Sequence, residues 1–135
     1  RHLINYRCGT GHSVSFVGNV HEGPHALNGR NTVVFQPGMI VTDEPGVYEG
    51  GQVGIRIENE LMCVHKADNQ YGTFLGFEPI MFVPIATSPV VPGVLTRDEL
   101  DWLNAYHREV FTKLAPHLTE EERDWLAKKC AAIGA

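Results

Sequence analysis

Two histidines lie in glycine-rich segments near the start of the chain, and both could do chemistry. His12 ends a Gly-Thr-Gly-His run at residues 9–12, and His21 lies within Asn-Val-His-Glu-Gly-Pro at residues 19–24. Neighbouring glycines let the backbone approach a ligand closely and let an imidazole face a cavity, where it can bind a metal ion or move a proton. A single histidine of this kind is more often a turn or core residue, so each one needs partners elsewhere in the sequence.

Two glutamates could supply such partners. Glu44 stands where a predicted strand enters a Pro-Gly turn, and Glu58 interrupts the otherwise apolar strand pattern of residues 54–59. A buried carboxylate needs a cation or a hydrogen-bonding partner to offset its desolvation. Arg56 lies two residues before Glu58 on the same strand face, so a structural ion pair is the simpler interpretation of that segment. Glu44, taken alone, is more typical of a solvated turn.

The combination of these residues is more informative than any one of them. His12, Glu44 and Glu58 form a mixed nitrogen and oxygen donor set from three separate elements. That set suits a divalent ion of hard or borderline character, such as Mn, Co or Zn. A metal ion held in this way with an open position lowers the pKa of bound water and yields a hydroxide nucleophile near neutral pH. His21 would then suit a proton shuttle or a hydrogen-bond donor to developing charge.

The order of these segments resembles the aminopeptidase P (Xaa-Pro aminopeptidase) branch of the creatinase-like, pita-bread metallopeptidases. The segments that carry the resemblance are residues 9–12, 20–24, 37–39, 43–46 with Tyr48, and 54–59. Two later segments, residues 96–107 and 114–116, resemble the C-terminal extension of that branch. The resemblance therefore covers essentially all of the chain.

The resemblance implies a reaction and a set of site residues. In the family, two divalent ions, commonly Mn, are held by two aspartates, one histidine and two glutamates. The histidine corresponds to His12, the first glutamate to Glu44, and the second glutamate, which bridges both ions, to Glu58. The resemblance also implies that His21 steadies substrate or the tetrahedral intermediate, and that Arg56 orients the metal-bound carboxylates. The substrates would be peptides with proline in the second position, from which the first residue is released.

The chain departs from the family pattern in two ways. The family's two aspartate ligands precede the Gly-Thr-Gly-His motif, but the eleven residues before His12 contain no aspartate, and the chain opens on Arg1 in place of Met. We therefore expect the C-terminal half of a catalytic domain, inactive alone. The second departure is Cys8, which stands where the family commonly has a histidine that lines the substrate pocket. Cys8 is accordingly predicted, with His21, to contact substrate.

The elements that position these residues can be predicted from local patterns. Runs of β-branched and aromatic residues, separated by Pro and Gly, predict strands over residues 32–35, 39–42, 52–65 and 73–77. Capping boxes at residues 96–99 and 119–122 predict two helices, the first reaching Pro116 and the second running through Ile133. The expected fold class is α+β: the second half of a pita-bread domain, with a curved antiparallel sheet and C-terminal helices. Residues 1–87 would form the metal-ligand-bearing half and residues 88–135 the C-terminal helical extension.

Composition restricts the remaining classes. The 135 residues are 43% hydrophobic, which favours a folded core over disorder. A net charge of −5 with 11 Lys and Arg argues against a nucleic-acid partner, and no apolar run is long enough to cross a membrane. The three cysteines have no Cys-x-x-Cys spacing and are interpreted as reduced thiols, which predicts a cytoplasmic protein.

A further expectation concerns the partners of the chain. Half of a curved sheet leaves an open edge and apolar surface, so we expect a homo-oligomer or association with a missing N-terminal half.

The alternative function is a non-catalytic pita-bread-like module that binds protein or peptide. The absence of the aspartate pair favours that alternative, and the presence of His12, Glu44 and Glu58 favours the enzyme.

Overall fold

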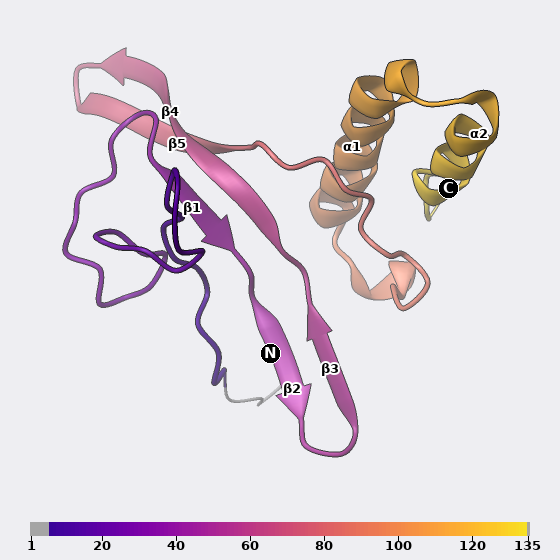
Figure 1. The fold of residues 1–135 in the computed structure, drawn as a ribbon, viewed down its shortest axis with the longest axis horizontal. Helices are drawn as coiled ribbons and strands as arrows, with labels where there is room; N and C mark the ends of the chain where they lie inside the picture. The colour runs from indigo at the N-terminus through magenta and orange to yellow at the C-terminus, as the bar shows by residue number, and fades with distance from the viewer. Residues whose placement is uncertain (1–5, 135) are drawn as a thin grey trace. The chain divides into compact units, whose positions relative to one another are not determined.

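The computed structural model describes residues 6–134, which divide into two compact units between Met81 and Phe82 (Figure 1). The first unit contains all the strands and the second contains both α-helices. No helix in the described range is long and apolar enough to span a bilayer. The residues predicted to bind metal all belong to the first unit.

The described part of the first unit is built from five antiparallel strands in two sheets. A three-stranded sheet has the order β1-β4-β5, and β2 and β3 pair with each other. The strands are β1 (Ile40–Asp43), β2 (Gly46–Glu49), β3 (Val53–Arg56), β4 (Asn59–Asn69) and β5 (Gly72–Pro79). A tight turn joins β2 to β3, where the Gln52 N–H donates to the Glu49 carbonyl over 2.9 Å and Gly51 has a positive φ of 71°, which glycine adopts without strain.

The two sheets follow one continuous register. Asp43 is opposite Asn59 in the β1–β4 ladder, and Gly46 is opposite Arg56 in the β2–β3 ladder. The second pair lies three residues later on one strand and three residues earlier on the other, so both ladders have the same register. Between them, the Ile57 N–H donates to the Pro45 carbonyl over 3.3 Å. The segment from β1 to β4 is therefore one long hairpin with a local break in its ladder (Figure 1).

An extended segment that contains His12 lies along the free edge of β1. The Thr42 N–H donates to the His12 carbonyl over 2.9 Å, the Glu44 N–H donates to the Thr10 carbonyl over 2.6 Å, and Ser13 forms a bridge with Val41. Val41 is fully buried, so the segment that contains His12 pairs with β1 next to a core residue of the unit. The backbone pairing fixes His12 opposite Thr42.

Two strand predictions need correction. Residues 32–35 form no strand, because the Asn31 side chain accepts from the Val33 N–H over 3.2 Å and donates to its carbonyl over 2.8 Å, which occupies the groups that a ladder would need. The single strand predicted over residues 52–65 is two strands, β3 and β4, separated at Ile57 and Glu58.

The second unit consists of two capped helices with short 3-10 turns. Its elements are η1 (Pro92–Val94), α1 (Arg97–Leu114), η2 (Ala115–His117) and α2 (Glu120–Lys129). Both predicted capping boxes form, at Thr96 with Glu99 and at Thr119 with Glu122. Tyr106, Val110 and Leu126 make the buried core.

The second helix ends earlier than the sequence predicts. α2 stops at Lys129, four residues before Ile133. The Asn104 side chain of α1 holds Ile133 instead, since its amide donates to the Ile133 carbonyl over 3.1 Å and accepts from the Ile133 N–H over 3.0 Å. These two bonds satisfy the backbone of Ile133 outside a helix.

A buried histidine makes the second unit sensitive to acid. His107 is 0% exposed, its Nε2 accepts from the Ile85 N–H over 3.1 Å, and burial lowers its pKa. The folded state therefore binds this proton less well than the unfolded state, so stability is expected to fall as pH drops below about 6.5, by at most ~1.4 kcal/mol per pH unit. Urea unfolding at pH 7.5, 6.0 and 5.0 measures the change.

The matched variant is His107→Gln, which keeps an acceptor for the Ile85 N–H and has no titrating group. Its free energy of unfolding should depend less on pH than that of the unmodified chain over the same range. An identical pH dependence in the two proteins would contradict the assignment of the effect to His107.

Candidate functional site

The predicted carboxylates lie at the break in the long hairpin. Glu44 directly follows β1 and Glu58 directly precedes β4, so continuing the register of the ladder sets the two residues opposite each other. Like charges opposite each other in a sheet repel, and their side chains need a positive group nearby. The positive group is Arg56, whose Nη1 lies 3.4 Å from Glu44 Oε2 and whose Nε lies 3.1 Å from Glu58 Oε2.

The hairpin leaves space for the arginine. Arg56 is opposite Gly46, which has no side chain, so the guanidinium can extend across the strand pair toward Glu44. The Tyr48 ring lies over Gly46 and Gly54, where a Cβ at either glycine would come within 3.0 Å of it. Glycines at these two positions therefore let the aromatic ring and the guanidinium share one face of the hairpin.

His12 approaches the same carboxylate from the neighbouring segment. Its Nε2 lies 3.0 Å from Glu44 Oε1, and its Nδ1 lies 3.0 Å from the Ser13 carbonyl oxygen. Because a carbonyl only accepts, Nδ1 carries a proton, and Nε2 of a neutral ring presents a lone pair to the carboxylate. Two lone-pair donors this close require a proton or a cation between them.

Charge and spacing both fit a bound cation. Two carboxylates and one guanidinium leave one net negative charge beside the His12 imidazole. The 3.0 Å between His12 Nε2 and Glu44 Oε1 is the length of an ordinary hydrogen bond or ion pair, and two ligands about 2.1 Å from one octahedral ion would lie about as far apart. The donor types of a divalent-metal site are thus present in His12, Glu44 and Glu58. Arg56 forms ion pairs with the two glutamates.

The ligand set is not assembled into a complete cluster. Across residues 6–134, no three His, Cys, Asp or Glu side chains converge closely enough to hold an ion. His12 and Glu44 are direct neighbours, whereas Glu58 is joined to Glu44 through Arg56. The neighbouring Asp43 has a pKa raised by partial burial.

The other predicted site residues differ in how closely they join this network. The His21 ring is exposed but lies against His12, with ring centroids 4.2 Å apart. Cys8 is a free, half-buried thiol, and among the described residues no hydrogen bond, ion pair or ring contact ties it to the network. Sequence reasoning missed Thr42, whose hydroxyl donates to Glu44 Oε1 over 2.9 Å. The signal in the sequence that could have indicated this contact is the spacing, since Thr42 precedes the predicted ligand Glu44 by two residues and so shares its strand face.

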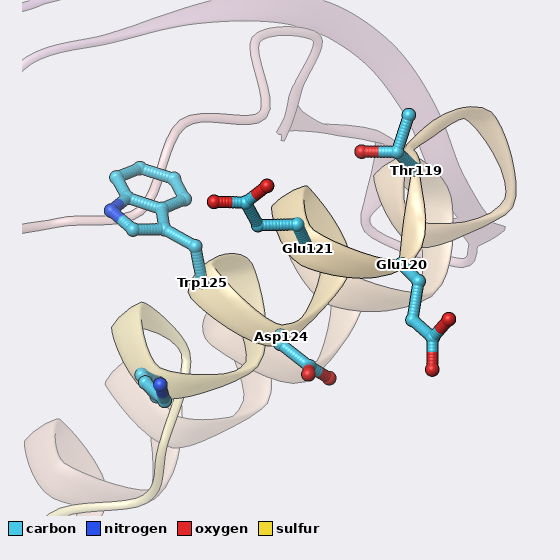
Figure 2. A pocket seen from close by; sticks show the side chains of 6 residues that line it. Thr119, Glu120, Glu121, Asp124 and Trp125 are labelled. Atoms are coloured by element: carbon cyan, nitrogen blue, oxygen red, sulfur yellow. The ribbon is translucent and has the colours of Figure 1, made fainter.

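A surface hollow in the second unit carries none of these residues. Figure 2 shows it at the N-terminus of α2, with the Trp125 ring on one side and acidic side chains beside it. The acidic residues Glu120, Glu121 and Glu122 occupy the first turn, where the helix dipole favours negative charge. That arrangement is explained by helix stability alone.

Comparisons with known proteins cover nearly all of the chain. A family profile described as "Metallopeptidase family M24" matches residues 2–65, and one described as "C-terminal region of peptidase_M24" matches residues 73–133. The chain is 42% identical to Aminopeptidase P1 of Lotus japonicus, over 97% of this chain and 21% of that protein. It is 47% identical to Aminopeptidase P2 of Arabidopsis thaliana, over 91% of this chain and 18% of that protein.

A solved structure of a similar protein supports the fold. An X-prolyl aminopeptidase from Caenorhabditis elegans, described as "a cytosolic enzyme with a di-nuclear active site", superposes with a TM-score of 0.78 at 38% identity. The match covers 93% of this chain and 21% of that one, so the chain spans about a fifth of the length of these relatives. The predicted α+β class, with antiparallel strands and two C-terminal helices, is confirmed.

Proposed function

The chain belongs to metallopeptidase family M24, and on that premise we propose that it contributes the carboxyl-terminal metal-ligand strands of an Xaa-Pro aminopeptidase. The substrates would be peptides with proline in the second position, and the reaction the release of the residue before it. The observation that carries the proposal is the contact network in which His12, Glu44, Arg56 and Glu58 meet at the break of one hairpin.

In this proposal His12, Glu44 and Glu58 are ligands of a divalent ion, most favourably Mn, with Co or Zn as alternatives and two ions in the complete enzyme. Such ions, when bound, supply a hydroxide nucleophile and polarise the scissile carbonyl. Arg56 pairs with both carboxylates and holds them on the same side of the hairpin. A metal ligand without such a support would turn toward solvent.

The two remaining predicted site residues, His21 and Cys8, would act on the peptide. His21 contacts the ring of His12, so its free nitrogen lies within reach of a peptide bound beside the ligands. An imidazole there donates a hydrogen bond to the oxygen that gains negative charge in the transition state. Cys8, which directly precedes the glycine-rich motif, would contact the substrate.

The remaining proposals concern the context of the chain. Residues 1–87 would act as the ligand-bearing half and residues 88–135 as its helical extension, in a cytoplasmic protein that self-associates or binds a separate N-terminal half. The chain alone would be inactive, because His12, Glu44 and Glu58 provide too few ligands for two ions. A non-catalytic peptide-binding module is the second candidate, and the incomplete ligand cluster favours it.

A chimera tests the proposed function. This chain replaces the matching segment of Arabidopsis Aminopeptidase P2, with which it is 47% identical. The chimera is expected to release the first residue of an Xaa-Pro peptide when Mn is supplied, and the isolated chain is expected to release none. A folded chimera without activity would contradict the proposed enzyme function and favour the binding module. Activity of the isolated chain would contradict its proposed incompleteness.

A further inference from the structure

Thr42 is buried at the centre of the candidate site, where its side chain touches both predicted ligand elements. The residue is 2% exposed and lies on β1, on the same strand face as Glu44 two residues later. His12 lies directly across from it on the neighbouring extended segment. A hydroxyl in this position has little access to water and must find its hydrogen-bond partners within the protein.

The two hydrogen bonds of the Thr42 hydroxyl have a fixed direction. The His12 backbone N–H lies 3.0 Å from Thr42 Oγ1, and an N–H can only donate, so the oxygen accepts there. Glu44 Oε1 lies 2.9 Å from the same oxygen, and a carboxylate can only accept, so the hydroxyl proton is donated to it. The His12 carbonyl, 3.5 Å away, is the weaker acceptor for that single proton.

The bond to Glu44 selects one orientation of the carboxylate. Oε1, the oxygen that accepts from Thr42, is also the oxygen that lies 3.0 Å from His12 Nε2, while Oε2 faces Arg56. Thr42 therefore holds Oε1 toward the imidazole and leaves Oε2 for the guanidinium. The same hydroxyl anchors the backbone of His12, so one side chain sets the position of both members of the closest ligand pair.

We propose that Thr42 is a positioning residue of the metal site, which fixes His12 and Glu44 in the geometry that binds a divalent ion. This inference rests on the proposed function for the identity of the ligands, although the hydrogen bonds of Thr42 do not depend on it. Supporting partners of metal ligands typically contribute ~10–100-fold to metal affinity. Removal of the Thr42 hydroxyl should weaken binding by that factor.

The test compares Thr42→Val, which keeps the shape and removes the hydroxyl, with Thr42→Ser, which keeps the hydroxyl. Thr73→Val is the matched control, because the Thr73 hydroxyl also donates to a carboxylate, that of Asp68, on an exposed part of the sheet. Mn²⁺ is titrated into each isotope-labelled chain while the paramagnetic broadening of the His12 signals is recorded by NMR. Hydrogen exchange of the His12 amide is measured without metal, with the Cys63 amide of β4 as an internal reference for folding.

We expect Thr42→Val to need ~10–100-fold more Mn²⁺ for the same broadening and to exchange its His12 amide faster, with Cys63 exchange unchanged. Thr42→Ser and Thr73→Val should behave like the unmodified chain. If Thr42→Val unfolds, Thr42→Ala is compared with Thr42→Ser in its place. Equal Mn²⁺ dependence and equal His12 exchange in the Val and Ser variants would overturn the proposal. If no chain binds Mn²⁺ but His12 exchange follows the hydroxyl, Thr42 only orders the His12 segment and its role at a metal site is overturned, whereas the chimera remains the test of the proposed function.

Discussion

Replacing Glu44 with glutamine is expected to abolish measurable binding of Mn²⁺ at His12, a loss of more than ~100-fold. The carboxylate is a predicted ligand in its own right, so its loss should exceed the ~10–100-fold typical of a supporting residue. The variant removes the negative charge that faces His12 Nε2 at 3.0 Å and Arg56 Nη1 at 3.4 Å. The amide keeps the size of the side chain and an oxygen that can accept from Thr42. Paramagnetic broadening during a Mn²⁺ titration measures the effect.

Glu49→Gln is the matched control for Glu44→Gln. It makes the same change of charge in the same hairpin, at the exposed end of β2. The control should retain the Mn²⁺ dependence of the unmodified chain, because long-range attraction between exposed charges and the ion is screened by salt. If both variants weaken binding equally, the ion is attracted only by the net negative charge of the hairpin, and Glu44 is not a ligand.

The helices could be predicted from sequence because their signals are local. A capping box needs only a threonine and a glutamate three residues apart, and both helices begin where those pairs are found. The motif residues were recognised by type and order. What remained hidden was how His12, Glu44 and Glu58 meet, since that depends on a register shared by strands that are far apart in sequence.

Two of the errors in the predicted strands and helices have one kind of cause. Asn31 occupies the backbone groups of Val33 and prevents a strand, and Asn104 captures the backbone of Ile133 and ends the second helix early. In both places a side-chain amide replaces the expected backbone partner. The spacing of apolar residues contains no information about a side-chain amide that binds the backbone from a neighbouring turn or from another helix.

The break between β3 and β4 follows from the chemistry of the site. A continuous ladder would set Glu44 and Glu58 opposite each other as an ordinary pair, with two like charges in contact. Pro45 cannot donate a backbone hydrogen bond, so the ladder weakens at that place and the strands can separate slightly. The two carboxylates then share the guanidinium of Arg56. The irregularity that sequence patterns missed is thus the place where Arg56 joins the two carboxylates.

Replacing Gly11 with alanine is expected to destabilise the first unit by about 3 kcal/mol, the upper end of the usual cost of overpacking. A Cβ at this position would overlap the carbonyl oxygen of Thr42 and would also crowd the Leu27 side chain at 3.1 Å. The overlapping atom belongs to the backbone of β1, so no side-chain rotation can relieve the contact. Urea unfolding followed by NMR signals of Val41 and Cys63, two buried apolar residues of this unit, measures the change.

The neighbouring Gly9→Ala provides the control, since a Cβ there meets no atom within 4 Å. If the close approach of Gly11 to β1 holds the ligand segment in place, only Gly11→Ala should lower the free energy of unfolding and weaken Mn²⁺ binding. Equal stability of the two variants would mean that the segment carrying His12 can shift away from β1 at no cost. The backbone hydrogen bonds of the segment to β1, and not the close packing of Gly11, would then hold His12 beside Glu44.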